Sequence, residues 1–233
     1  MTKANTSTQA AVMTSPAPSD TLPLPSEALI VGAIADISAL ELHNFECDLI
    51  ELRLDSLGLG AKVVEFAKFT PSPLLITARG ASEGGTSDWS VGDRLAAYEQ
   101  FLPYASAIDI ELRDFDHFSG IIESAKAGNV LVVGSCHDFE KTPSFDTLKS
   151  KIGSTADIHK FATRIQEKAD LQTHLELLNE KTPLSVMGMG PLGAAARPLM
   201  AKSGSLLNYG YLGATPTAPD QWPAGLLKQT LSL

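Results

Sequence analysis

The sequence predicts a single (β/α)8 barrel, the TIM-barrel fold. From Ala28 onward, short apolar runs alternate with helical stretches, which is the pattern of βα units built around a parallel sheet. Eight such units can be counted, and a chain of 233 residues is long enough for a compact barrel. The alternative is a doubly wound open sheet, but no Gly-x-Gly-x-x-Gly follows the first predicted strand. The barrel is therefore favoured.

The chain divides into a tail and one domain. Residues 1–26 consist largely of Ser, Thr, Ala and Pro, a composition that cannot bury enough apolar surface to fold. We expect a disordered tail there and the barrel over residues 27–233. With 44% hydrophobic and 19% charged residues, the chain can form a substantial core.

The strands are expected in chain order, each followed by a helical stretch. Their predicted ranges are 29–34, 47–55, 73–79, 107–112, 130–137, 158–163, 183–189 and 206–212. Amphipathic or Ala/Leu-rich stretches such as 93–102 and 171–178 predict the intervening helices.

The second strand separates cleanly into an apolar and a charged face, because side chains alternate along a strand. The face that suits the helix layer carries Ile50, Leu52 and Leu54, and the face left for the barrel interior carries Glu51, Arg53 and Asp55.

The third, fourth and sixth strands repeat this separation. The inner faces are predicted to carry Leu75, Thr77 and Arg79, then Asp109 and Glu111, then Ile158, Lys160 and Ala162. Buried charges cost several kcal/mol each unless they are paired, so a charged interior indicates a ligand site. A solvated edge strand could explain one such face but not three. Sites of this fold lie at the C-terminal ends of the strands.

Lys160 is a candidate nucleophile on the inner face of the sixth strand. Burial lowers the pKa of an amine and releases the uncharged form, which attacks carbonyl carbons. The alternative is a lysine at a strand end whose ammonium reaches water.

His137 ends the fifth strand, next to the strand that carries Lys160. An imidazole titrates near neutral pH and is suited to proton transfer, although a lone histidine can also be structural. A nucleophilic pair of Cys136 and His137 is disfavoured, because adjacent strand residues point to opposite faces.

Composition excludes several other classes of protein. A net charge of -9 without clustered Lys or Arg argues against a nucleic-acid partner. No apolar run approaches the roughly 20 residues that span a bilayer, and the N-terminus lacks a secretory signal, so we expect a cytoplasmic protein without membrane contact. Cys47 and Cys136 are expected to be buried reduced thiols, and no His or Cys spacing indicates a metal site.

Seven segments together resemble one known family over residues 28–230. They are Ile50-Glu51-Leu52-Arg53-Leu54-Asp55, Thr77-Ala78-Arg79 with Glu83-Gly84-Gly85, Asp109-Ile110-Glu111-Leu112, Ser135-Cys136-His137-Asp138-Phe139 with Thr142-Pro143, the segment around Lys160, Met189-Gly190-Pro191-Leu192-Gly193 through Arg197, and Thr217-Ala218-Pro219-Asp220-Gln221. The chain thus resembles the type I 3-dehydroquinate dehydratases.

The resemblance implies a lyase of the shikimate pathway that converts 3-dehydroquinate to 3-dehydroshikimate without a cofactor. It implies that Lys160 forms an imine with the ring ketone, that His137 is the general acid and base, and that Glu83 orients His137 and favours its charged form. The residues implied to bind the substrate are Arg197 for the carboxylate, Glu51, Arg53 and Arg79 for the ring hydroxyls, and Thr217 and Gln221 on a closing loop. A homodimer is a further family expectation.

The loop departs from the family pattern at two positions. The family usually reads Ser-Ala-Pro-Gly-Gln, whereas this chain has Thr217 and Asp220 in place of the serine and the glycine. Asp220 adds a negative charge near the expected carboxylate site, but aspartate tolerates a positive φ better than most residues.

The alternative functions are another Schiff-base lyase or class I aldolase, and a non-catalytic barrel that binds a hydroxy acid.

Overall fold

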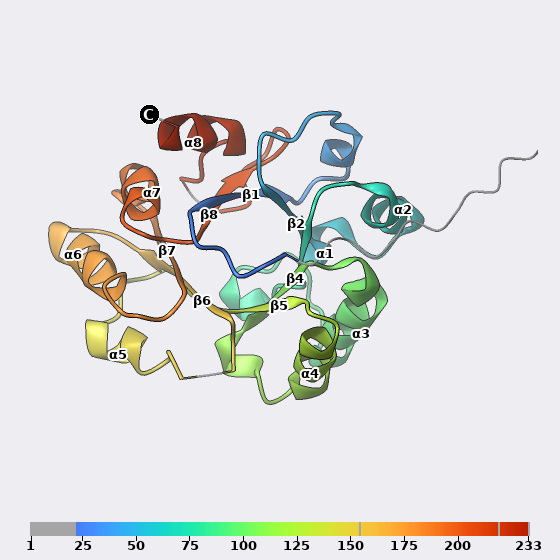
Figure 1. Cartoon of the computed structure of the whole chain (residues 1–233), viewed down its shortest axis with the longest axis horizontal. Coiled ribbons are helices and arrows are strands. Elements are labelled where there is room, and N and C mark those ends of the chain that lie inside the picture. The colour runs from blue at the N-terminus through green and yellow to red at the C-terminus, as the bar shows by residue number, and fades with distance from the viewer. Residues whose placement is uncertain (1–21, 154, 219, 233) are drawn as a thin grey trace, which may run out of the picture.

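The protein is a barrel of eight parallel strands surrounded by helices, as Figure 1 shows. The computed structural model describes residues 22–153, 155–218 and 220–232. Most of the predicted tail, residues 1–21, lies outside these ranges. Across them, no helix combines the length and the apolar character needed to span a bilayer.

Each strand is followed by helical structure, in the order expected for βα units. The strands are β1 Leu29–Ile34, β2 Leu49–Arg53, β3 Leu74–Thr77, β4 Ala107–Glu111, β5 Leu131–Asp138, β6 Ile158–Arg164, β7 Leu184–Met189 and β8 Leu207–Tyr211. The α-helices are α1 Leu54–Leu57, α2 Ala61–Phe69, α3 Val91–Phe101, α4 Ser119–Ala127, α5 Phe145–Lys149, α6 Lys168–Leu177, α7 Gly193–Lys202 and α8 Ala224–Leu231. Short 3-10 helices cover Ile37–Glu41, Ala81–Glu83, Leu102–Tyr104 and Leu112–Asp114.

The strands pair in the order β7-β6-β5-β4-β3-β2-β1-β8, and every paired neighbour is parallel. The ring comes close to closing between β7 and β8, where the Leu206 amide donates to the Leu184 carbonyl at 2.8 Å. The strand ends therefore form one continuous rim around the axis.

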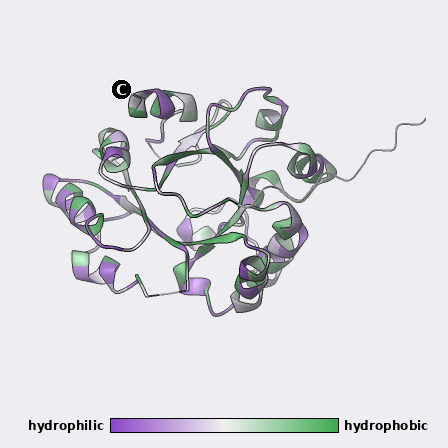
Figure 2. Ribbon diagram, in the orientation of Figure 1, coloured by the Kyte–Doolittle hydropathy of each residue, from purple (hydrophilic) through white to green (hydrophobic). Residues whose placement is uncertain are grey.

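The core has an inner and an outer layer. Inside the ring, Val31, Leu49, Leu75, Val133 and Ile158 pack together and fill the barrel. Outside it, the other faces of the strands pack against the helices, and the aromatic side chains Tyr98 and Phe101 of α3 lie in this layer. Figure 2 shows hydrophobic residues along the strands and both kinds of residue on the helices, as expected for helices with one buried face.

The sequence predicted every strand to within two residues at each end. The predicted faces of the second strand are also correct for Ile50, Leu52 and Leu54, which pack in the outer core. One difference is the end of β2, because the chain turns into α1 after Arg53 and carries Asp55 out of the strand. Asp55 therefore does not line the barrel interior and instead pairs with Arg53.

The buried side chain of His174 is expected to make the stability of the fold depend on pH. Its side chain is buried on α6 and lies 2.6 Å from the Thr163 hydroxyl, and burial lowers its pKa from 6.5 to about 4. In the unfolded chain, His174 binds a proton near pH 6.5, whereas in the folded protein it stays neutral until about pH 4. The free energy of unfolding should therefore fall by about 3 kcal/mol between pH 7 and 4. His174→Gln can keep the bond to Thr163 without titrating. Between pH 7 and 4, the free energy of unfolding measured in urea should fall by about 3 kcal/mol more for the wild type than for the variant. Parallel pH profiles of the two proteins would contradict this role of His174.

Candidate active site

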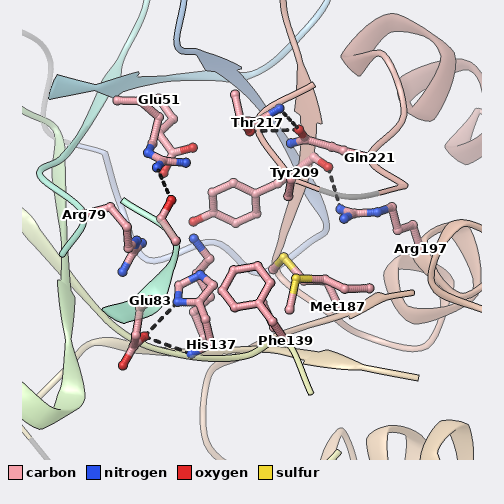
Figure 3. A pocket seen from close by; sticks show the side chains of 16 residues that line it. Glu51, Arg79, Glu83, His137, Phe139, Met187, Arg197, Tyr209, Thr217 and Gln221 are labelled. Atoms are coloured by element: carbon pink, nitrogen blue, oxygen red, sulfur yellow. Dashed lines mark hydrogen bonds and ion pairs between the residues drawn. The ribbon is translucent and has the colours of Figure 1, made fainter. Parts of the chain in front are cut away.

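A cavity opens at the C-terminal ends of the strands, the place where sites of this fold lie. The structure brings all the predicted site residues together around it: Glu51, Arg53, Arg79, Glu83, His137, Lys160, Arg197, Thr217 and Gln221. Figure 3 shows side chains from several strands and loops converging there. Further lining residues, which the site prediction omitted, include Phe139, Ala162, Met187, Met189 and Tyr209.

Lys160 is held inside the barrel on β6, with only 4% of its surface exposed. Its Nζ lies 2.8 Å from Asp109 Oδ2 and 3.9 Å from the centre of the Tyr209 ring. Burial lowers the pKa of Lys160, and the charges of Asp109 and Glu51 oppose that change. The amine is thus easier to deprotonate than a surface lysine, which is the property an imine-forming nucleophile needs.

Asp109 is the residue that fixes Lys160, and the prediction placed it inside the barrel without assigning it to the site. Its second oxygen accepts hydrogen bonds from Arg79 at 2.8 Å and from the Ser135 hydroxyl at 2.6 Å. Burial tends to raise the pKa of Asp109, but the charges of Arg79 and Lys160 lower it below its ordinary value. The carboxylate stays ionised and holds the lysine in one position.

His137 extends from the end of β5 and is oriented by Glu83. The Glu83 carboxylate lies 2.9 Å from His137 Nδ1 and accepts the His137 backbone N–H at 2.9 Å. An Nδ1 that donates to this carboxylate leaves Nε2 as the proton acceptor.

The other surroundings of His137 outweigh the preference for a charged imidazole that was expected of Glu83. Burial lowers the pKa of His137 well below 6.5, and the positive charges of Arg79 and Lys160 lower it further. Burial also raises the pKa of Glu83. The resting imidazole is therefore neutral and suited to accept a proton.

The turn after Glu83 explains the two glycines that follow it. Gly84 has φ +87°, a backbone conformation that residues other than glycine rarely adopt, and a Cβ there would lie 2.7 Å from the Phe139 ring. A Cβ on Gly85 would lie 2.2 Å from the Arg79 carbonyl oxygen. The tight turn keeps the Glu83 carboxylate against His137.

Arg197 reaches the cavity from α7, which packs tightly on β7. A Cβ on Gly193 would lie 3.0 Å from the Gly188 backbone, so the small residue allows this close approach. Arg197 is 3% exposed, and one guanidinium nitrogen donates to the Tyr209 backbone carbonyl at 3.0 Å.

No carboxylate in the described ranges lies within ion-pair distance of Arg197, and its Nε is buried without a partner there. Burial lowers the pKa of Arg197 to about 10, with Asp220 opposing the change. A buried cation without a paired anion is costly, so the site is prepared for an anionic ligand.

The other two predicted arginines are already engaged by carboxylates. Arg53 makes a two-point contact with Asp55 at 2.9 and 2.8 Å, and Arg79 contacts Asp109 and Glu111 at 2.8 and 3.2 Å. Both still line the cavity, so they present a fixed positive edge to a ligand.

The Thr217 loop is organised by Gln221, whose side-chain oxygen accepts from the Thr217 backbone and hydroxyl at 2.8 Å each. Asp220 adopts φ 57°, as its tolerance of positive φ predicted, and its charge acts on Arg197. The aspartate thus occupies a glycine-like position on the side of the cavity where the guanidinium lies.

Cys136 and His137 do not form a nucleophilic pair. The Cys136 side chain packs in the outer core with Phe161 and Leu148, on the opposite face of β5 from the cavity. Burial raises the pKa of Cys136, and it raises the pKa of Cys47 to about 11. Both thiols are free and poorly reactive.

Comparison with known proteins agrees with this geometry. A family model described as type I 3-dehydroquinase matches residues 32–233. The "3-dehydroquinate dehydratase" of Methanocella arvoryzae is 32% identical over 83% of this chain and 90% of the relative, and the "Catabolic 3-dehydroquinate dehydratase" of Acinetobacter baylyi is 33% identical over 85% and 77%. The solved structure of 3-dehydroquinate dehydratase from Enterococcus faecalis has 26% identity and a TM-score of 0.69, covering 90% of this chain and 95% of that one. The chain belongs to the type I 3-dehydroquinase family.

Proposed function

We propose that this enzyme dehydrates 3-dehydroquinate to 3-dehydroshikimate in the shikimate pathway through an imine on Lys160. The observation that carries the proposal is Lys160, 4% exposed, in a cavity that also holds a general base and a guanidinium with no carboxylate partner among the described residues. These groups match a ketone, an acidic C–H bond and a carboxylate in one small ring.

Arg197 binds the substrate carboxylate in this proposal, because its planar fork can donate to both oxygens and has no carboxylate partner in the described part of the chain. Glu51, Arg53 and Arg79 face the ring hydroxyls. Thr217 and Gln221 close the loop over the ring and keep water away from the imine.

Imine formation begins when the uncharged Lys160 amine attacks the C3 ketone of the substrate. His137 takes the proton that the amine nitrogen releases after the attack and donates it to the hydroxyl of the carbinolamine, which leaves as water. The ammonium of Lys160 gives up its proton more easily because it is buried, and Asp109 stabilises the positive charge that returns on the iminium nitrogen.

Dehydration follows on the enzyme-bound ring. The iminium accepts the electron pair when a C2 proton is removed, which gives an enamine, and this electron pair then expels the C1 hydroxyl as water. His137 takes the C2 proton and returns a proton to the leaving hydroxyl, while Glu83 stabilises the imidazolium formed in between. Hydrolysis of the product imine restores Lys160.

We also infer a cytoplasmic enzyme that needs no metal or nucleotide cofactor and functions as a homodimer. The dimer rests on the family resemblance, and sedimentation of the purified protein measures it.

The direct test of the function is turnover of 3-dehydroquinate by the purified protein. The product contains a conjugated enone, so ultraviolet absorbance should rise with time, and a saturating dose of EDTA should leave the rate unchanged. No absorbance change at any substrate concentration would refute the proposed function, and activity lost in EDTA but restored by one metal would refute the mechanism.

A further inference from the structure

The hydroxyl of Tyr209 is a buried polar group in the cavity with no hydrogen-bond partner among the described residues. Tyr209 lies on β8 and is 4% exposed, and its ring lies 3.9 Å from Lys160 Nζ. Leaving such a hydroxyl without a partner costs about 1–3 kcal/mol. Because the ring lines the cavity, the missing partner is an oxygen of water or of a ligand.

The direction of the hydroxyl narrows the choice of ligand atom. Figure 3 shows it pointing away from Arg197, toward the side of the cavity where Glu51 and Arg79 lie. Burial raises the pKa of Tyr209 well above 10, and the charges of Asp109 and Glu51 raise it further. The phenol is therefore neutral and has a proton to donate.

Resting on the proposed function, we infer that the Tyr209 hydroxyl binds the C4 hydroxyl of 3-dehydroquinate. When the C1 carboxylate is on Arg197, C4 lies at the opposite end of the six-membered ring. C4 is also bonded to C3, the carbon that Lys160 attacks, and the Tyr209 ring lies beside that amine. Tyr209 thus recognises a ring oxygen that the reaction leaves in place, and it sets the specificity of the enzyme for 4-hydroxylated rings.

Tyr209→Phe tests this inference, because it removes one oxygen and keeps the ring beside Lys160. The Michaelis constant for 3-dehydroquinate should rise about 3- to 10-fold, the effect of one neutral hydrogen bond that replaces a bond to water. The turnover number should change little, because no bond at C4 is made or broken.

A substrate analogue without the C4 hydroxyl makes the test specific. The wild type should lose a similar factor in kcat/KM on this analogue, and Tyr209→Phe should lose almost nothing more, since the two changes remove the same contact. If the two losses multiply, or if the Michaelis constant of the variant is unchanged, the hydroxyl does not bind C4 and the inference is wrong.

Tyr98→Phe is a matched control in the same barrel. The Tyr98 hydroxyl donates to the Asp109 carbonyl at 2.5 Å and accepts from the Ala78 amide at 3.2 Å, so its loss should lower the thermal midpoint and affect both substrates equally. Tyr209→Phe, which removes no bond within the described protein, should keep the wild-type midpoint. Wild-type turnover with multiplying losses would overturn only the Tyr209 inference, whereas no wild-type turnover would overturn the proposed function as well.

Discussion

Replacing Lys160 with alanine is expected to abolish both turnover and covalent capture of the substrate. Borohydride added with 3-dehydroquinate reduces the imine to a stable secondary amine, so mass spectrometry should find one adduct, on Lys160. The variant should form none, and its turnover number should fall by about 10⁵- to 10⁶-fold, as when other enzymes lose a covalent nucleophile.

Two further variants separate loss of the nucleophile from loss of the fold. Lys160→Arg keeps a cation beside Asp109, so the buried carboxylate stays paired, but the guanidinium cannot form the imine. It should be as inactive as the alanine variant and closer to the wild type in stability. Lys62→Ala removes a largely exposed lysine and should retain both adduct and turnover. An adduct that maps to another lysine would disprove the assignment of Lys160.

The fold and the polar interior could be predicted because they depend on local pattern. Alternation along a strand is set by the backbone, so Glu51 and Lys160 could be placed inside the barrel from their neighbours alone. Which side chains contact one another across the barrel depends on the register between strands and on the paths of the loops. The pairing of Ser135 with Lys160 across β5 and β6, and the reach of Asp109 to both Arg79 and Lys160, appear only in three dimensions.

Other site residues gave weaker signals in the sequence. Arg197 lies on a helix, where an arginine is normally at the surface, and only the close packing of α7 on β7 buries it at the cavity. Tyr209 lies on β8, a strand whose inner and outer faces were not assigned from the sequence. The parity of β8 could have found it, because Leu207 and Tyr209 both face the barrel interior.

His137→Asn is expected to slow turnover by about 10²- to 10⁴-fold, the range for general acid-base groups. Asparagine places an amide nitrogen near the position of Nδ1 and can keep the bond to Glu83, but it has no group that accepts a proton at Nε2. Measured turnover should fall while borohydride still traps substrate on Lys160, although more slowly, because Lys160 is the group that attacks and water can supply the proton for loss of the carbinolamine hydroxyl. Glu83→Gln should cost less than His137→Asn, since the glutamine oxygen can still accept from Nδ1.

The combination of slow turnover and retained adduct distinguishes a proton-transfer role from the alternatives. If His137 were only structural, the asparagine variant would turn over at nearly the wild-type rate, because its contact with Glu83 is preserved. If His137 were required to shape the cavity around Lys160, trapping would be lost together with turnover. We expect slow turnover with a retained adduct. Glu83 holds Nδ1, and the charges of Arg79 and Lys160 oppose a charged imidazole, so His137 gains a proton only while the substrate chemistry supplies one.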